Sequence, residues 1–327
     1  MRYDVVSLGP ARMDVFVFLP EDEITETCSI DKQACMISLG FGDKIPVTKM
    51  EFCIGGNTGN NAVGLSRLGF KAAMVGTMGD HWIDRQALEI LKSENVNVDH
   101  MTHEPNKFGF GVIINYQGER TILSYYPESE CMFKIGEGLE ADWVYLTTAG
   151  KNYDCFYEDA VKWAKSINAR IVFNPGSRQI KDGVEKIRYA YEAAELIFVN
   201  KEESRELLGK DHLAEVRELL DGLRSLGPKI AVVTDGPAGS YVSDGEKYLF
   251  MPIVDAPIVE RTGAGDAFGS GFMAAYMAGK SLEDCLRWGS CNSAAKLGFV
   301  GPQAGLLTRE KMEEWIEKSS FVAATAM

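Results

Sequence analysis

The sequence predicts an α/β protein with three layers, in which helices cover both faces of a mostly parallel central sheet. Six short apolar runs, rich in β-branched or aromatic residues, have the length of buried strands and stop at glycine or polar residues. Segments in which apolar side chains recur with helical spacing lie between these runs. Alternating strands and helices are typical of a parallel sheet covered on both sides.

The predicted elements follow one another along the whole chain. In the segment 61–68, for example, Ala62, Val63, Leu65 and Leu68 fall on one helix face. The predicted strands are 5–8, 72–75, 143–146, 171–173, 196–199 and 230–233, with a further β-like run at 253–259. The predicted helical segments are 61–68, 82–91, 156–167, 214–226, 264–279, 281–297 and 308–318.

Two regions interrupt the alternation. Residues 15–54 contain strand-like runs at 15–18, 35–39 and 47–53 without an intervening helix, and residues 107–126 contain two more around a turn at 117–119. We expect both regions to form a small antiparallel sheet, here called the lid. Because the chain has no repeat and no low-complexity linker, residues 1–14, 55–106 and 127–327 are expected to form one large α/β domain.

Composition and charge exclude several classes of function. The 327 residues are 46% apolar and 25% charged, as in ordinary globular proteins, and the net charge is −13. An acidic excess of this size argues against nucleic-acid and membrane-surface partners. The seven cysteines form no C-x-x-C pair, so a zinc site is not expected. We expect reduced thiols and a cytoplasmic protein, since no apolar stretch approaches the roughly 20 residues of a membrane span.

The segment Thr262-Gly263-Ala264-Gly265-Asp266 carries the clearest chemical signal. Its three small residues let a ligand approach their backbone amides at the start of a predicted helix, where unpaired N–H groups favour an anion. The carboxylate of Asp266 could then take a proton from a hydroxyl that attacks this anion. The alternative is that Asp266 only complements the helix dipole as a first-turn acid.

A second glycine-rich segment also leads from a strand into a helix. It reads Gly55-Gly56-Asn57-Thr58-Gly59-Asn60, and its carboxamides could face a polyhydroxylated ligand or only cap the helix. The spacing differs from the dinucleotide-binding fingerprint, and the sequence contains no phosphate-binding P-loop motif.

Taken together and in order, these motifs resemble those of the pfkB family of carbohydrate kinases, whose fold is ribokinase-like. The resemblance covers nearly the whole chain. Besides the two glycine-rich segments, the matching elements are Asp14 after Gly9, Gly76-Thr77-Met78-Gly79-Asp80, Asn200-Lys201-Glu202-Glu203, and Thr234-Asp235-Gly236 with Gly239.

The resemblance implies transfer of a phosphoryl group from ATP to a hydroxyl of a sugar or sugar-like acceptor. Asp266 would be the general base, and the amides of Gly263, Ala264 and Gly265 would form the anion hole. The implied acceptor site comprises Asp14, Gly55, Gly56, Asn57 and Asn60. The implied nucleotide site comprises Asn200, Glu203, Thr234, Gly236, Gly239 and Asn292, with Glu203 ordering Mg²⁺ through water.

Several points stay open in the sequence. Glu260 and Arg261 stand where the family usually has Asp-Thr, so the monovalent-cation site of some members is uncertain here. Arg120 could reach from the lid towards the acceptor, but the favoured interpretation is a solvated hairpin arginine. The Met and Phe residues at 35–41 could pack the lid or form a homodimer contact.

Two other functions remain as alternatives. The first is a nucleoside kinase of the same superfamily, in which aromatic lid residues stack on a base; the candidates are Phe16, Phe18, Phe108 and Phe110. The second is a sugar-binding regulatory protein without turnover. The presence of Asp266 argues against it, because a protein without turnover has no need of a general base.

Overall fold

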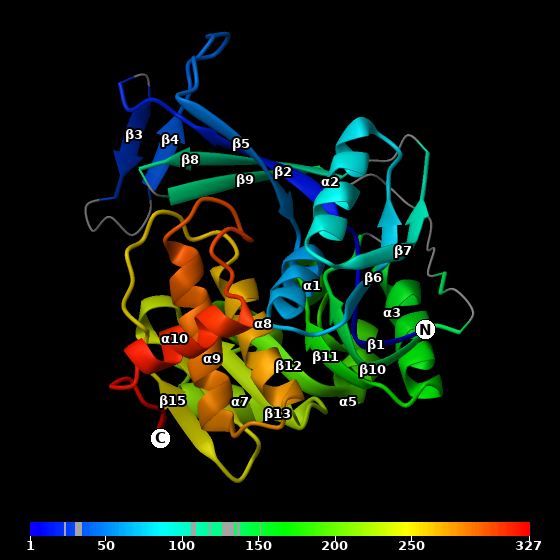
Figure 1. The fold of residues 1–327 in the computed structure, drawn as a ribbon. Helices are drawn as coiled ribbons and strands as arrows, with labels where there is room; N and C mark the ends of the chain where they lie inside the picture. Colours follow the sequence, from blue (N-terminus) through cyan, green and yellow to red (C-terminus); the bar gives the residue numbers. More distant parts are fainter. Residues whose placement is uncertain are drawn as a thin grey trace.

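The computed structural model describes residues 1–22, 24–29, 35–105, 109–117, 119–125, 134–135, 138–150 and 152–327. Phe108, and the predicted lid residues 23, 30–34, 107, 118 and 126, lie outside this part of the chain. Figure 1 shows a large α/β body with a second, smaller group of strands standing over one end of it.

The large body is organised by one ten-stranded sheet with the order β16-β15-β14-β13-β12-β11-β10-β1-β6-β7. Neighbouring strands are parallel from β7 to β13, and antiparallel from β13 to β16. The strands are β1 (Arg2–Leu8), β6 (Ala72–Met78), β7 (Asn97–His103), β10 (Glu140–Thr147), β11 (Arg170–Asn174), β12 (Ala194–Asn200), β13 (Ile230–Thr234), β14 (Ser240–Ser243), β15 (Tyr248–Met251) and β16 (Thr325–Ala326).

The six predicted strands of the parallel sheet are all confirmed. The β-like run at 253–259 is wrong as a strand, because the chain leaves the sheet after Met251 and the segment has no regular structure. Pro252 and Pro257 lack the N–H that a sheet ladder needs, which is a physical reason for this difference.

Helices cover both faces of the sheet and complete the three layers, as predicted. Helices α3 to α7 pack on one face, whereas α1 and α8 to α10 pack on the other; α2 lies against β7 and against a lid strand. The helices are α1 (Asn57–Arg67), α2 (Trp82–Ser93), α3 (Tyr153–Ser166), α4 (Ser177–Asp182), α5 (Arg188–Ala193), α6 (Lys201–Leu208), α7 (Val216–Ser225), α8 (Ala264–Met277), α9 (Leu282–Leu297) and α10 (Arg309–Lys318), with 3₁₀ turns η1 (Val184–Ile187) and η2 (Gly236–Ala238). Among the described residues, none of the helices is long and apolar enough to cross a bilayer.

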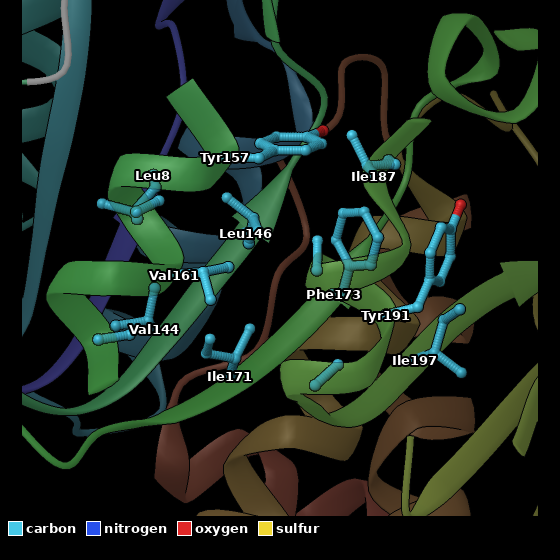
Figure 2. Packing of buried hydrophobic residues seen from close by; sticks show 14 of the residues in the cluster. Leu8, Val144, Leu146, Tyr157, Val161, Ile171, Phe173, Ile187, Tyr191 and Ile197 are labelled. Carbon is cyan, nitrogen blue, oxygen red and sulfur yellow. The ribbon is translucent and has the colours of Figure 1, made fainter. Parts of the chain in front are cut away.

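Aromatic side chains fill the core on the face that α3 and α5 cover. Figure 2 shows Tyr157, Phe173 and Tyr191 lying side by side among buried aliphatic residues. The ring centroids of Tyr157 and Phe173 are 5.5 Å apart, and those of Phe173 and Tyr191 are 5.0 Å apart, both in edge-to-face geometry. This geometry is favourable for aromatic pairs, so the core holds the parallel strands in a fixed arrangement.

The lid is a separate four-stranded sheet with the order β5-β2-β8-β9. Its strands are β2 (Arg12–Phe18), β5 (Lys49–Gly55), β8 (Phe110–Tyr116) and β9 (Glu119–Tyr125). The pairs β2–β5 and β8–β9 are antiparallel as expected, but β2 and β8 are parallel. These two strands belong to separate excursions of the chain, so no tight turn forces them to run in opposite directions.

A two-stranded hairpin, β3 (Thr25–Cys28) with β4 (Cys35–Ser38), extends from the lid. The expectation of reduced thiols is wrong here, because Cys28 and Cys35 form a disulfide. The antiparallel register places these two residues directly opposite each other, with Cα atoms 4.0 Å apart. Cys53, Cys285 and Cys291 are free, as expected.

Candidate active site

The turn that the sequence predicts to bind an anion, residues 263–265, lies where helix α8 begins and is here called the anion-binding turn. Gly263 is the N-cap residue and has a left-handed backbone, with φ of 79°. A β-carbon at this position would lie 2.5 Å from Pro302, so both the backbone angle and the available space require glycine. The amide of Gly265 belongs to the first turn and has no carbonyl partner within the helix, whereas the amide of Ala264 donates to the carbonyl of Arg261 at 3.2 Å. The turn therefore has the geometry and the dipole of an anion site.

Asp266 lies in the same first turn, and its side chain reaches helix α1. Its Oδ2 accepts a hydrogen bond of 2.8 Å from Nδ2 of Asn60, a residue of helix α1. Burial raises the pKa of the Asp266 carboxyl to about 6, and the Asn60 bond opposes this shift. A carboxylate with a pKa just below neutrality is ionised at pH 7 and still basic enough to accept a proton.

Three of the six predicted nucleotide residues share one cavity of about 370 Å³ with the turn at the start of α8, whereas Asn200, Glu203 and Asn292 are not among its lining residues. Thr234, Gly236 and Gly239 line one side, where β13 ends and β14 begins, and Ala264 and Gly265 line another. Small and apolar side chains from α8, α9 and the segment 253–258 complete the walls. The cavity therefore combines an apolar floor with an anion-binding end, which is the combination that a nucleotide requires.

Two arginines that the sequence analysis did not assign to a site also line this cavity. Arg120 is exposed on lid strand β9, as expected of a solvated hairpin residue, and it also lines this cavity. Arg261 lines it next to the anion-binding turn and forms an ion pair of 3.2 Å with Glu119 of the same lid strand. The local sequence does not predict the ion pair between Arg261 and Glu119, because the two residues are far apart in the chain and meet only where the lid packs.

Asn200 and Glu203 form a reciprocal capping box at the start of α6. Oδ1 of Asn200 accepts from the N–H of Glu203 at 2.7 Å, and Oε2 of Glu203 accepts from the N–H of Asn200 at 2.9 Å. Burial raises the pKa of Glu203, and the negative charge of Asp266 adds to this shift. The carboxylates of Glu203 and Asp266 repel each other, and a divalent cation near them would relieve this repulsion. Glu203 and Asp266 therefore fit a magnesium ion.

Asp14 is a buried carboxylate within lid strand β2. Its Oδ1 lies 3.0 Å from Nε of Arg12, while burial raises its pKa against the effect of that arginine. β-Carbons at Gly55 and Gly111 would lie 1.7 and 2.2 Å from the two carboxylate oxygens. These glycines on β5 and β8 therefore leave the space that the carboxylate occupies. A glycine inside a predicted strand was the signal for Gly111, which the sequence interpretation missed.

Two asparagines at the start of α1 make hydrogen bonds to distant parts of the chain, including the end of strand β11. Gly56 is the N-cap of α1, with φ of 88°, and Nδ2 of Asn57 donates to Oδ1 of Asn174 at 2.9 Å. Oδ1 of Asn60 accepts from Nε2 of Gln303 at 3.2 Å. Asn174 was missed, although a polar residue at the end of a buried parallel strand marks the edge where ligands bind.

Asn292 lies behind α8, and its side chain is fully buried. Its Nδ2 donates to the carbonyl of Ala267 at 2.8 Å, and its Oδ1 accepts from the N–H of Leu307 at 2.9 Å. These contacts fix the start of α8 against α9 and the following loop. Asn292 is not among the residues that line the cavity, so these contacts give it a supporting position in the packing of α8 and no contact with the predicted nucleotide site.

The comparisons with known proteins agree with this architecture. The family model described as "pfkB family carbohydrate kinase" matches residues 24–309. The chain is 26% identical to ribokinase of Bacillus subtilis over 283 residues, which is 84% of this chain and 91% of that protein. It is 25% identical to a nucleoside kinase of Methanothermobacter thermautotrophicus over 266 residues, 80% of this chain and 83% of that one.

A solved structure gives the same result for the fold. Arabidopsis thaliana ribokinase, complexed with ribose and ATP, superposes with a TM-score of 0.76 over 97% of this chain and 99% of that one, at 20% identity. The predicted ribokinase-like fold and the family resemblance are thus confirmed. This chain belongs to the pfkB family of carbohydrate kinases, ATP-binding phosphotransferases that use an alcohol group as acceptor.

Proposed function

We propose that this enzyme transfers the γ-phosphoryl group of ATP to a hydroxyl of a sugar or sugar-like acceptor, with Asp266 as general base. Asp266 takes the proton of the acceptor hydroxyl while its oxygen bonds to the γ-phosphorus, and the bond from that phosphorus to the bridging oxygen of ADP breaks. The amides of Gly263, Ala264 and Gly265 stabilise the charge on the transferred group.

One observation carries this proposal: Asp266 lies between the donor cavity and the acceptor residues. Its neighbours Ala264 and Gly265 line the cavity, whereas its own carboxylate accepts a hydrogen bond from Asn60 on α1. A base must contact the hydroxyl that attacks and must also lie next to the phosphoryl group. The position of Asp266 supports both requirements.

The acceptor site in this proposal comprises Asp14, Asn57 and Asn60, with Gly55 and Gly56 providing close backbone approach. A buried carboxylate accepts hydrogen bonds from adjacent hydroxyls, and carboxamides both donate and accept, so the set suits a polyol.

On the donor side, Thr234, Gly236 and Gly239 would hold the nucleotide, and Asn200 and Glu203 would organise Mg²⁺ and phosphates, largely through water. When bound, the ion neutralises phosphate charge. The raised pKa of Glu203, with Asp266 as a contributing negative charge, supports this assignment.

The test is a coupled ADP-release screen over pentoses, hexoses, sugar acids, sugar phosphates and nucleosides. Asp266→Asn should lower kcat on the acceptor found by about 10²–10⁴-fold, the range for losing a general base. The matched control is Asp284→Asn, which removes another first-turn acid from the neighbouring helix α9. If both variants kept the kcat of the unaltered enzyme, Asp266 would be a dipole-complementing acid only.

A nucleoside acceptor is the second candidate, and one observation favours it. Asp14, Phe16 and Phe18 alternate along β2 and share one face of the lid sheet, so an aromatic ring adjoins the acceptor carboxylate. Nucleoside turnover with no sugar turnover in the same screen would select this candidate.

We also propose that the enzyme forms a homodimer through the lid. Exposed apolar side chains gather on its strands and hairpin, where Phe41, Met36 and Tyr125 are more than half exposed. Sedimentation analysis of the unaltered protein and of a Met36→Ser/Tyr125→Ser variant tests this proposal, since only the former should sediment as a dimer.

A further inference from the structure

A lysine is completely buried directly behind the anion-binding turn. Lys296, the penultimate residue of α9, has an exposed fraction of 0%. Its ammonium donates to the backbone carbonyl of Glu260 at 2.7 Å and lies 3.2 Å from that residue's carboxylate Oε2. Burial lowers the pKa of Lys296, and Glu260 opposes this shift by favouring the charged form.

The partner of this lysine connects it to the turn. Oε1 of Glu260, which is also buried, accepts from the N–H of Thr262 at 2.6 Å and from the Thr262 hydroxyl. Thr262 immediately precedes Gly263, the N-cap of α8. The N–H of Val259 also donates to the carbonyl of Leu297 at 2.8 Å, so the segment before the turn is attached to the end of α9.

The two oxygen atoms of Glu260 that contact Lys296, the backbone carbonyl oxygen and Oε2, are also of the kind that bind a hard metal cation. A backbone carbonyl and a carboxylate oxygen are the ligands that such ions prefer, and the end of a helix favours positive charge. Here, however, the Lys296 ammonium contacts both Glu260 oxygens. The residues present therefore do not fit a monovalent metal ion between Glu260 and α9.

We propose that Lys296 is a built-in cation that positions the anion-binding turn, so that the enzyme needs no monovalent metal ion for activity. The ammonium holds the carbonyl and carboxylate of Glu260, and Glu260 holds the backbone of Thr262. The amides of residues 263–265 are thereby fixed in the orientation that phosphoryl transfer requires. Lys296 is a positioning residue, and its role rests on the function proposed above for the turn.

The first measurement is kcat of the unaltered enzyme in potassium, sodium and tetramethylammonium chloride at equal ionic strength, which should be the same in all three. The second uses Lys296→Ala, which opens a space beside the Glu260 oxygens. In tetramethylammonium chloride its kcat should fall by about 10²-fold, as expected for misplaced catalytic groups. Potassium or ammonium chloride should restore part of kcat and raise its melting temperature, with no such effect on the unaltered enzyme.

Lys247→Ala is the matched control, because it removes an exposed ion pair with Glu283 at the other end of α9. Its kcat should stay the same in every salt. A second variant, Lys296→Met with Glu260→Gln, removes both charges and keeps an acceptor for Thr262, so no unpaired charge is buried. Its kcat should be lowered and should not respond to salt.

Three results would overturn the proposal: activation of the unaltered enzyme by potassium, full kcat in the double variant, or a loss in Lys296→Ala that no cation relieves. Melting temperatures need no turnover, so the response of Lys296→Ala to potassium is measurable even if the screen finds no acceptor. An unaltered enzyme that releases no ADP with any acceptor would contradict the proposed function and leave the cation measurement valid.

Discussion

Replacing Asp266 by asparagine should stabilise the fold and remove the pH dependence of the reaction. Burial raises the pKa of this carboxyl from 3.8 to about 6, so the folded protein bears the cost of an ionised group at neutral pH. Each pKa unit corresponds to about 1.4 kcal/mol, which gives an upper limit of about 3 kcal/mol at pH 7. Water reaches part of the side chain, so the measured gain should lie below this limit.

The sign of the effect follows from proton binding. Between pH values near 3.8 and about 6 the folded state binds more protons at Asp266 than the unfolded state. The free energy of unfolding therefore decreases as pH rises through this window. Asp266→Asn has no such group, so its advantage should be largest at pH 7 and should vanish below the ordinary pKa. Urea denaturation of both proteins at pH 4 and pH 7 measures the difference.

The same carboxyl should control the rate. As a base Asp266 acts ionised, so with a pKa of about 6 kcat should be about tenfold lower at pH 5 than at pH 7. Asp284→Asn, which changes an exposed first-turn acid, should keep both the profile and the stability within about 1 kcal/mol. A flat profile between pH 5 and pH 7, or no gain in stability in Asp266→Asn, would refute the assigned environment of the base.

Other perturbations test the remaining parts of the site. Asp14→Asn should raise the acceptor KM at least about tenfold and leave the ATP KM unchanged, because a buried charged partner is lost; a shift confined to the ATP KM would contradict the assignment. Glu203→Gln should raise the Mg²⁺ concentration needed for half-maximal activity, and an identical Mg²⁺ titration would leave Glu203 as a helix cap. Arg120→Ala should raise the ATP KM without lowering the melting temperature, since this arginine lines the nucleotide cavity from an exposed strand. Gly111→Ala should weaken acceptor binding, because its β-carbon would lie 2.2 Å from a carboxylate oxygen of Asp14, and unchanged acceptor kinetics would show that the carboxylate can move away.

Local sequence was sufficient for the framework of this protein. Six of the seven parallel strands, all except β7, and the major helices follow from apolar periodicity, which depends on residues only a few positions apart. The turn at residues 263–265 was identified for the same reason, since small residues before a helix suffice to mark an anion site. The prediction of a strand at 253–259 was wrong because the β-like side chains outweighed Pro257 within the run and Pro252 before it, although proline lacks the N–H donor on which a strand depends.

Only the tertiary structure decided which distant groups meet. Asn60 bonds to Asp266 across 206 positions of sequence, and the lid brings Arg120 to a cavity formed mostly by the α/β domain. The pairing of Lys296 with Glu260 likewise depends on how α9 packs behind the turn. Such contacts depend on the packing of whole layers, and no local spacing encodes them. The sequence by itself therefore predicted the candidate site residues and the elements that carry them, whereas tertiary packing decided their partners, their pKa values and the ammonium group behind the turn at residues 263–265.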